Sequence, residues 1–230
     1  MSANSVDDIG TMPTLPLLRE GDRLTADEFH RRYEGMPYLK NANLVDGVVY
    51  MSSPIHTHHS GAHFDVIGWL APYRYSVVVV AGHDNVSWRI DGQNEVQPDA
   101  ILCLDAAHDG AVVDGGRLLR GVPELVVEVA VSSARADAGP KRALYERTGV
   151  QEYVLWRVRD DRLDWWALTD GSYQPLPADE NGVIKSVVFP GLWLDVPALI
   201  ADDMPRVMAT RDAGLGSLEH HAFAARLRQV

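Results

Sequence analysis

Two carboxylates stand in apolar surroundings in this sequence and are the first candidates for chemistry. Asp99 opens one apolar run, and Glu128 lies in the middle of another. Because burial of an unpaired charge costs free energy, a carboxylate in a buried strand is expected to be paired or metal-bound. On adjacent strands, the two side chains would form the oxygen-rich pocket that Mg²⁺ prefers. Spacing alone leaves an alternative open, in which Asp99 caps a bend and Glu128 pairs with Arg142 or Arg157.

A lysine on the following helix could complete this site. The sequence predicts a helix over residues 135–148, on which Lys141 and Tyr145 are four residues apart and share a face. If Lys141 returned over the end of the Glu128 strand, it could orient or help deprotonate an attacking water and offset phosphate charge. Asp137, four residues before Lys141, could pair with it. Outside such a context, Lys141 would be a solvated helix lysine.

A group of histidines stands where another helix is expected to begin: His56, His58, His59 and His63. Imidazole is a common zinc ligand, but only His59 and His63 have a spacing of four residues, and no cysteine supports them. A dedicated zinc site is therefore disfavoured. Contact of His59 with a substrate phosphate stays open beside ordinary packing.

The elements that would position these residues indicate a mixed α/β domain. Thr25 and Glu28 match a capping box at the start of a helix that ends near Gly35. Asp46-Gly47 between two apolar runs indicates a hairpin. Ala62, Val66 and Leu70 would form one apolar face of a later helix. The expected strands cover residues 77–80 with a partner at 86–90, then 96–104, 123–131, 152–158, 162–168 and an edge strand within 183–189.

Length and composition suit one domain with extensions. The chain has 230 residues, of which 46% are hydrophobic, and we divide it into an arm (1–20), a domain (21–200) and a partly helical extension (201–230). The single cysteine, Cys103, excludes an internal disulfide. No segment suits a membrane span or a signal peptide, so we expect a cytoplasmic protein. The net charge of −11 argues against a general nucleic-acid coating role.

Several motifs in order resemble the Uma2 family, formerly DUF820, of the PD-(D/E)XK restriction-endonuclease-like superfamily. They are VQPD (96–99), ELVVEV (124–129), SS (132–133), KRALY (141–145) and GVQEY (149–153). The resemblance spans about residues 24–196. It implies a restriction-endonuclease-like mixed sheet flanked by helices, with additional hairpins.

The resemblance also implies roles for the candidate residues. Asp99 and Glu128 would hold Mg²⁺ or Mn²⁺, to which the carbonyl of Val129 could add a ligand, and Lys141 would be the active-site lysine. The superfamily pattern places this lysine two residues after the glutamate, where Ala130 stands here. The implied activity is hydrolysis of phosphodiester bonds in nucleic acid, with DNA favoured as the substrate.

One departure from the family pattern keeps other functions open. Many relatives have a glutamate where Asn43 stands, and its loss would remove one anionic ligand, although an amide oxygen can still bind a cation. A non-catalytic binding or assembly module is therefore one alternative, and a hydrolase of small phosphoesters is another. A homodimer is also plausible, because cutting both strands of a duplex needs two sites.

Overall fold

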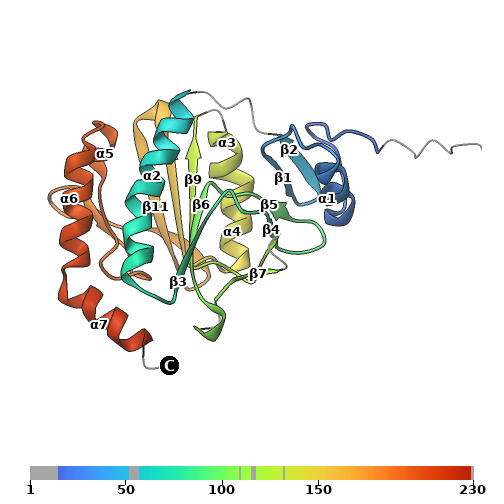
Figure 1. Ribbon diagram of the computed structural model, residues 1–230. Helices are drawn as coiled ribbons and strands as arrows, with labels where there is room; N and C mark the ends of the chain where they lie inside the picture. The colour runs from blue at the N-terminus through green and yellow to red at the C-terminus, as the bar shows by residue number, and fades with distance from the viewer. Residues whose placement is uncertain (1–14, 52–56, 109, 115–117, 132, 229–230) are drawn as a thin grey trace, which may run out of the picture.

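The fold is built on two sheets of six strands each (Figure 1). The computed structural model describes residues 15–51, 57–108, 110–114, 118–131 and 133–228, with no account of the side chains of 57–59. The first sheet has the order β2 (Val48–Met51), β1 (Ala42–Val45), β5 (Glu95–Val96), β4 (Trp88–Arg89), β8 (Leu118–Arg120) and β7 (Val112–Asp114). The second has the order β12 (Ser172–Pro175), β11 (Arg162–Thr169), β10 (Glu152–Arg157), β9 (Leu125–Ala130), β6 (Ala100–Leu104) and β3 (Val80–Asp84).

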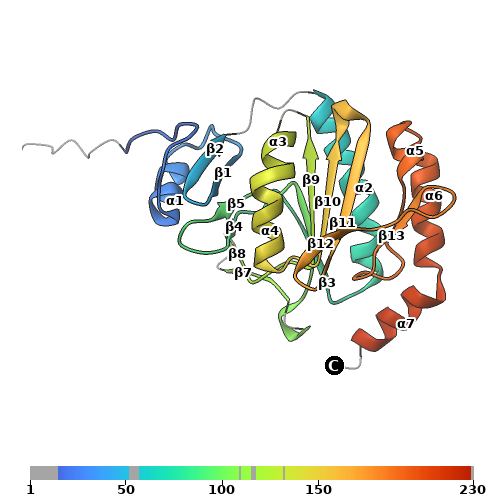
Figure 2. The same cartoon turned by 180° about the vertical axis from the view of Figure 1, so that it is seen from behind.

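Helices cover both faces of the second sheet (Figures 1 and 2). One face carries α2 (Thr57–Ser76), and the other carries α3 (Ala134–Ala136), the π-helical turn η2 (Asp137–Lys141) and α4 (Arg142–Thr148). The remaining elements are α1 (Ala26–Glu34), η1 (Ala106–His108), η3 (Val158–Asp160), β13 (Val183–Lys185), β14 (Trp193–Asp195), α5 (Val196–Ile200), α6 (Met204–Leu215) and α7 (Leu218–Leu227). No helix in the described part of the chain has the length and apolar character needed to cross a bilayer.

The mixed sheet and its flanking helices confirm the predicted fold class. β9 and β10 run parallel, whereas the other pairs in the second sheet are antiparallel. Ala62, Val66 and Leu70 form a buried face of α2, as the helical period predicts. The hairpin of β1 and β2 turns at Asp46 and Gly47, which both have positive φ angles.

The start of α1 confirms only part of the predicted capping box. Thr25 is the N-cap, and its hydroxyl oxygen accepts a hydrogen bond from the Glu28 amide at 3.3 Å. The Glu28 carboxylate, however, accepts a hydrogen bond from Arg32 at 2.7 Å and also pairs with Arg31.

Four predicted strands differ from the structure in extent or pairing. The strand expected over residues 77–80 begins only at Val80, and Val78 is 83% exposed. β4, within the expected partner 86–90, pairs with β5 and β8 in the other sheet. The run 96–104 is divided at Pro98, so that β5 and β6 belong to different sheets, because proline lacks the amide that a continuous ladder needs. Of the edge strand expected within 183–189, residues 183–185 form β13, which among the described strands pairs with β14 in a separate two-stranded sheet and not with either six-stranded sheet.

Candidate active site

Glu128 lies on the face of β9 that α4 covers. Its neighbours on that face, Val126 and Ala130, pack with Leu144 of α4, whereas Val127 and its alternate neighbours pack toward α2. This confirms the predicted face of the strand, since residues two apart on a strand share a side. Glu128 is 3% exposed, so its carboxylate needs a partner.

The partners of Glu128 come from the helix that follows the strand. Lys141 Nζ lies 3.0 Å from Glu128 Oε1, and the hydroxyl of Tyr145 donates a hydrogen bond to the same oxygen at 2.7 Å. The expected shared face of Lys141 and Tyr145 is therefore present. The alternative, in which Glu128 pairs with an arginine, is wrong. Arg142 lies over the ring of Trp166, and Arg157 pairs with aspartates of its own hairpin.

A π-helical turn brings a second carboxylate, that of Asp137, to Lys141. Asp137 Oδ1 lies 3.0 Å from Lys141 Nζ, an ion-pair contact rather than an aligned hydrogen bond. Within the turn, Pro140 has no amide to donate, and the amide of Arg142 reaches back five residues to the carbonyl of Asp137. Asp137 is 1% exposed and Lys141 5% exposed, so the turn presents both side chains to the protein interior.

Asp99 joins the cluster from the end of the neighbouring strand. The ladder between β6 and β9 ends at the pair Ala100 and Val127. Beyond it, Asp99 Oδ2 accepts a hydrogen bond from the amide of Val129 at 2.7 Å and so continues the pairing with a side chain. This contact holds Asp99 beside the Glu128 strand, as a site formed on adjacent strands requires.

The charges in the cluster strongly perturb one another. Burial raises the pKa of Glu128; Lys141 opposes this effect, and the charges of Asp137 and Asp99 add to it, giving a pKa of about 8. Burial alone would lower the pKa of Lys141, but the surrounding carboxylates outweigh it, and the net shift is upward. Lys141 is therefore held as an ammonium ion.

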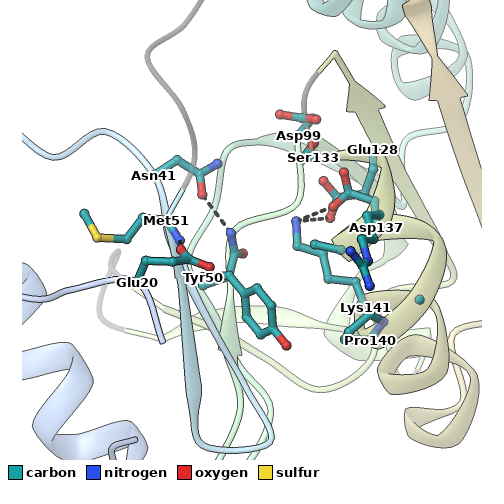
Figure 3. A pocket seen from close by; sticks show the side chains of 14 residues that line it. Glu20, Asn41, Tyr50, Met51, Asp99, Glu128, Ser133, Asp137, Pro140 and Lys141 are labelled. Atoms are coloured by element: carbon teal, nitrogen blue, oxygen red, sulfur yellow. Dashed lines mark hydrogen bonds and ion pairs between the residues drawn. The ribbon is translucent and has the colours of Figure 1, made fainter. Parts of the chain in front are cut away.

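The cluster forms one wall of a pocket of about 590 Å³ (Figure 3). The opposite wall comes from the β1–β2 hairpin and the segment before α1. The described lining residues are Glu20, Asn41, Asn43, Tyr50, Met51, Asp99, Glu128, Ser133, Arg135, Ala136, Asp137, Gly139, Pro140 and Lys141. Two parts of the chain that lie far apart in sequence therefore line the same pocket.

Asn43, where the family resemblance implies a glutamate, forms hydrogen bonds within this wall. Its Oδ1 accepts a hydrogen bond from the amide of Gln97 at 2.8 Å, and its Nδ2 donates to Asn41 Oδ1 at 2.9 Å. Because a backbone amide can only donate, the atom that faces Gln97 must be the oxygen. Asn43 thus links β1 to the segment that leads into Asp99.

Of the four histidines, His63 is the one whose side chain the structure describes. Its Nε2 lies 2.9 Å from the carbonyl oxygen of Asp99 and 3.1 Å from Asp84 Oδ1. His63 therefore supports the backbone at Asp99. His56 and the side chains of His58 and His59 lie outside the described residues.

The donor set around Glu128 suits a hard divalent cation. Mg²⁺ commonly uses one or two protein carboxylates, with waters and substrate phosphate as its other ligands. Asp99, Glu128 and Asp137 gather near a single ammonium, so once Glu128 is ionised the cluster carries excess negative charge that a divalent cation would neutralise. Within the described ranges, no group of three or more His, Cys, Asp or Glu side chains is placed to hold a metal ion, so a cation bound by one or two of these carboxylates would take its other ligands from solvent, backbone or substrate.

Comparison with known proteins places the chain among nuclease-like folds. The family model for Uma2, described as "Putative restriction endonuclease", matches residues 26–197. A solved structure with a similar fold is described as a putative nuclease belonging to DUF820 from Anabaena variabilis ATCC 29413. The similarity has a TM-score of 0.59 at 12% sequence identity and covers 77% of this chain and 98% of the other. A search of curated proteins found no match.

Proposed function

The chain belongs to the Uma2 family, and on that basis and on the geometry of the pocket we propose that it is a metal-dependent nuclease. Its substrate would be nucleic acid, with DNA favoured, and its reaction the hydrolysis of phosphodiester bonds. The observation that carries the proposal is the convergence of Asp99, Glu128 and Lys141 on one pocket. Strongly perturbed ionisable groups that gather in a cleft mark candidate functional sites.

Two carboxylates would hold the cation. Asp99 and Glu128 would bind Mg²⁺ or Mn²⁺, and the carbonyl of Val129 could add a backbone ligand. When bound, such an ion polarises a phosphoryl oxygen and lowers the pKa of a coordinated water.

The residues around the carboxylates would prepare the site for a phosphate. The raised pKa of Lys141 favours a role as a fixed positive charge and hydrogen-bond donor over a role as a general base. Lys141 can thus orient a water and stabilise charge that develops on phosphate oxygens. Lys141 and Tyr145 share Glu128 Oε1 and thereby fix the orientation of this carboxylate.

Glu128→Gln tests the proposal, with Glu124→Gln as a matched control. Glu124 is also buried, has a pKa raised by burial, and lies directly before the same strand, but it lines a different pocket. We expect wild type and Glu124→Gln to bind Mn²⁺ in calorimetry and to cleave plasmid or oligonucleotide. Glu128→Gln should do neither, while its circular dichroism spectrum stays that of wild type.

Other outcomes would change the assignment. Unchanged Mn²⁺ binding by Glu128→Gln would refute the proposed metal site. Absence of Mn²⁺ binding by wild type would favour the non-catalytic binding module. Binding of Mn²⁺ with hydrolysis of bis(p-nitrophenyl) phosphate, but of no nucleic acid, would favour a small phosphoester as substrate.

A further inference from the structure

The carboxylate–lysine cluster lies in the wall of the pocket and is almost completely buried. Asp99, Glu128, Asp137 and Lys141 are each at most 5% exposed. The hairpin wall, with Asn41 and Tyr50, stands opposite them in Figure 3. A phosphate can reach the cluster only if the strand that carries it enters the pocket.

The described lining of the pocket has few cationic groups that could bind phosphates. The described lining includes four carboxylates, of Glu20, Asp99, Glu128 and Asp137, and two cations, Arg135 and Lys141. Lys141 is held by Glu128 and Asp137. A duplex held through about six to ten phosphate contacts would need a comparable number of cationic groups, and the described lining offers two.

Arg135 is the lining cation that is available to a substrate. Its side chain is exposed at the rim, next to the turn that carries Asp137. Among the residues that the structure describes, no carboxylate forms an ion pair with it, whereas Lys141 has two such partners. Arg135 can therefore bind one phosphate beside the scissile one.

The opposite wall presents an aromatic ring and an amide. Tyr50 is half-buried and is the cross-strand partner of Asn43, so both side chains face the pocket. Asn41 uses its oxygen to accept from Asn43, and Figure 3 shows its Nδ2 turned to the pocket side. Aromatic rings stack on unpaired bases of any sequence, and a side-chain amide can donate to acceptor atoms on a base edge.

We propose that the substrate is a single strand, from which one unpaired nucleotide enters the pocket. Its base lies against Tyr50 and Asn41, its scissile phosphate lies at the carboxylate–lysine cluster, and Arg135 binds the adjacent phosphate. This inference rests on the proposed nuclease function. It adds to that function a preference for unpaired over duplex nucleic acid.

Cleavage rates with Mn²⁺ test the preference directly. Four substrates are compared: one labelled DNA sequence as a single strand and as a blunt duplex, the same sequence as single-stranded RNA, and bis(p-nitrophenyl) phosphate. We expect cutting of a single strand at least about tenfold faster than of the duplex, since unpairing costs a few kcal/mol. The DNA and RNA arms identify which single strand is preferred.

Substitutions test the assigned residues. Tyr50→Ala should raise KM for the single strand about five- to a hundredfold, the loss that removal of one stacking ring produces. Tyr38→Ala, at an exposed tyrosine outside the pocket lining, is the control and should match wild type. Arg135→Ala should reduce the slope of log KM against log salt concentration by the amount that corresponds to about one phosphate contact. Arg159→Ala, at an exposed arginine outside the pocket lining, is its control and should leave this slope unchanged. Mn²⁺ affinity should stay unchanged in all four variants.

The outcomes separate this inference from the proposed function. Equal or faster cutting of the duplex would overturn the inference and leave the nuclease proposal standing. Single-strand cutting that Tyr50→Ala and Arg135→Ala leave unchanged would overturn the assigned binding mode. If wild type cuts no nucleic acid, with or without hydrolysis of the small phosphoester, both the nuclease proposal and the inference fail.

Discussion

The hydroxyl of Tyr145 offers the most selective perturbation of the site. It donates a hydrogen bond to Glu128 Oε1 at 2.7 Å, and both side chains are buried. Tyr145→Phe removes this donor and keeps the ring, which stacks on Trp88 with 5.9 Å between centroids and meets Tyr153 edge-on at 5.2 Å. The variant therefore isolates one hydrogen bond to a buried carboxylate.

The size of the effect follows from the charge on the acceptor. A hydrogen bond to a charged group contributes about 1.5–3 kcal/mol to stability, compared with about 0.5–1.5 kcal/mol for a neutral one. For a chain of this length, Tyr145→Phe should therefore lower Tm by about 3–12 °C at about pH 9, where Glu128 is ionised. Tyr173→Phe is the matched control, because its buried hydroxyl donates to the neutral carbonyl of Val150 at 3.0 Å. Its Tm should fall by less.

The pH dependence gives a sharper test. The pKa of Glu128 is raised from 4.5 to about 8 in the folded protein, so the stability linked to it is full below about pH 4.5 and is lost as the pH rises through about 8. The Tyr145 bond lowers this pKa, and its removal raises the pKa further. The penalty of Tyr145→Phe should thus be larger at about pH 9 than at about pH 6. Thermal unfolding in EDTA at both pH values measures it, and an equal penalty, or one no larger than that of Tyr173→Phe, would refute the reasoning.

Three further predictions concern the same cluster and one turn. Lys141→Met leaves Glu128 and Asp137 without their cation, and chemical denaturation should show a loss of about 3–5 kcal/mol together with loss of cleavage. Mn²⁺ affinity, followed by calorimetry, should rise about tenfold per pH unit and level off above about pH 8, because Glu128 must release its proton to bind the ion. Gly191→Ala should lower the free energy of unfolding by at least about 1–2 kcal/mol in urea titration without changing Mn²⁺ affinity, because φ is +90° and a Cβ atom would lie 2.6 Å from Cβ of His220.

Periodicity in the sequence was enough to place the central residues. The alternation along β9 predicts which side of the sheet Glu128 occupies, and the helical period predicts that Lys141 and Tyr145 point the same way. Both predictions are confirmed by contacts to a single oxygen, Glu128 Oε1. These rules succeed because each depends only on neighbours within one element.

Strand pairing could not be predicted in the same way. The valines at 77–79 have a high strand propensity, yet the ladder with β6 begins at Val80 opposite Leu104. Propensity describes what fits a pleated surface, whereas the partner strand decides where pairing starts. At Pro98, the chain passes from one sheet to the other, and no local pattern reveals that the two halves of the run have different partners.

The residues of the second wall of the pocket also could not be predicted from the sequence. Asn41 and Tyr50 lie more than eighty residues before Lys141 in the chain, and only the packing of the two sheets brings them to the same pocket. Asp137 could be expected to pair with Lys141, but its near-complete burial depends on the π-helical turn. That burial is what makes its charge act so strongly on Glu128.

Two buried glutamates on adjacent strands show why the surroundings, rather than burial, point to function. Glu152 begins β10, and both of its oxygens accept hydrogen bonds from neutral donors: the indole of Trp165, the hydroxyl of Ser186 and the amides of residues 187 and 188. Such a carboxylate holds a loop in place. Glu128 instead belongs to a buried cluster with two other carboxylates and one ammonium. Because replacement of a buried ion cluster by apolar side chains is often neutral or stabilising, stability does not explain this arrangement, whereas the proposed binding of a cation would.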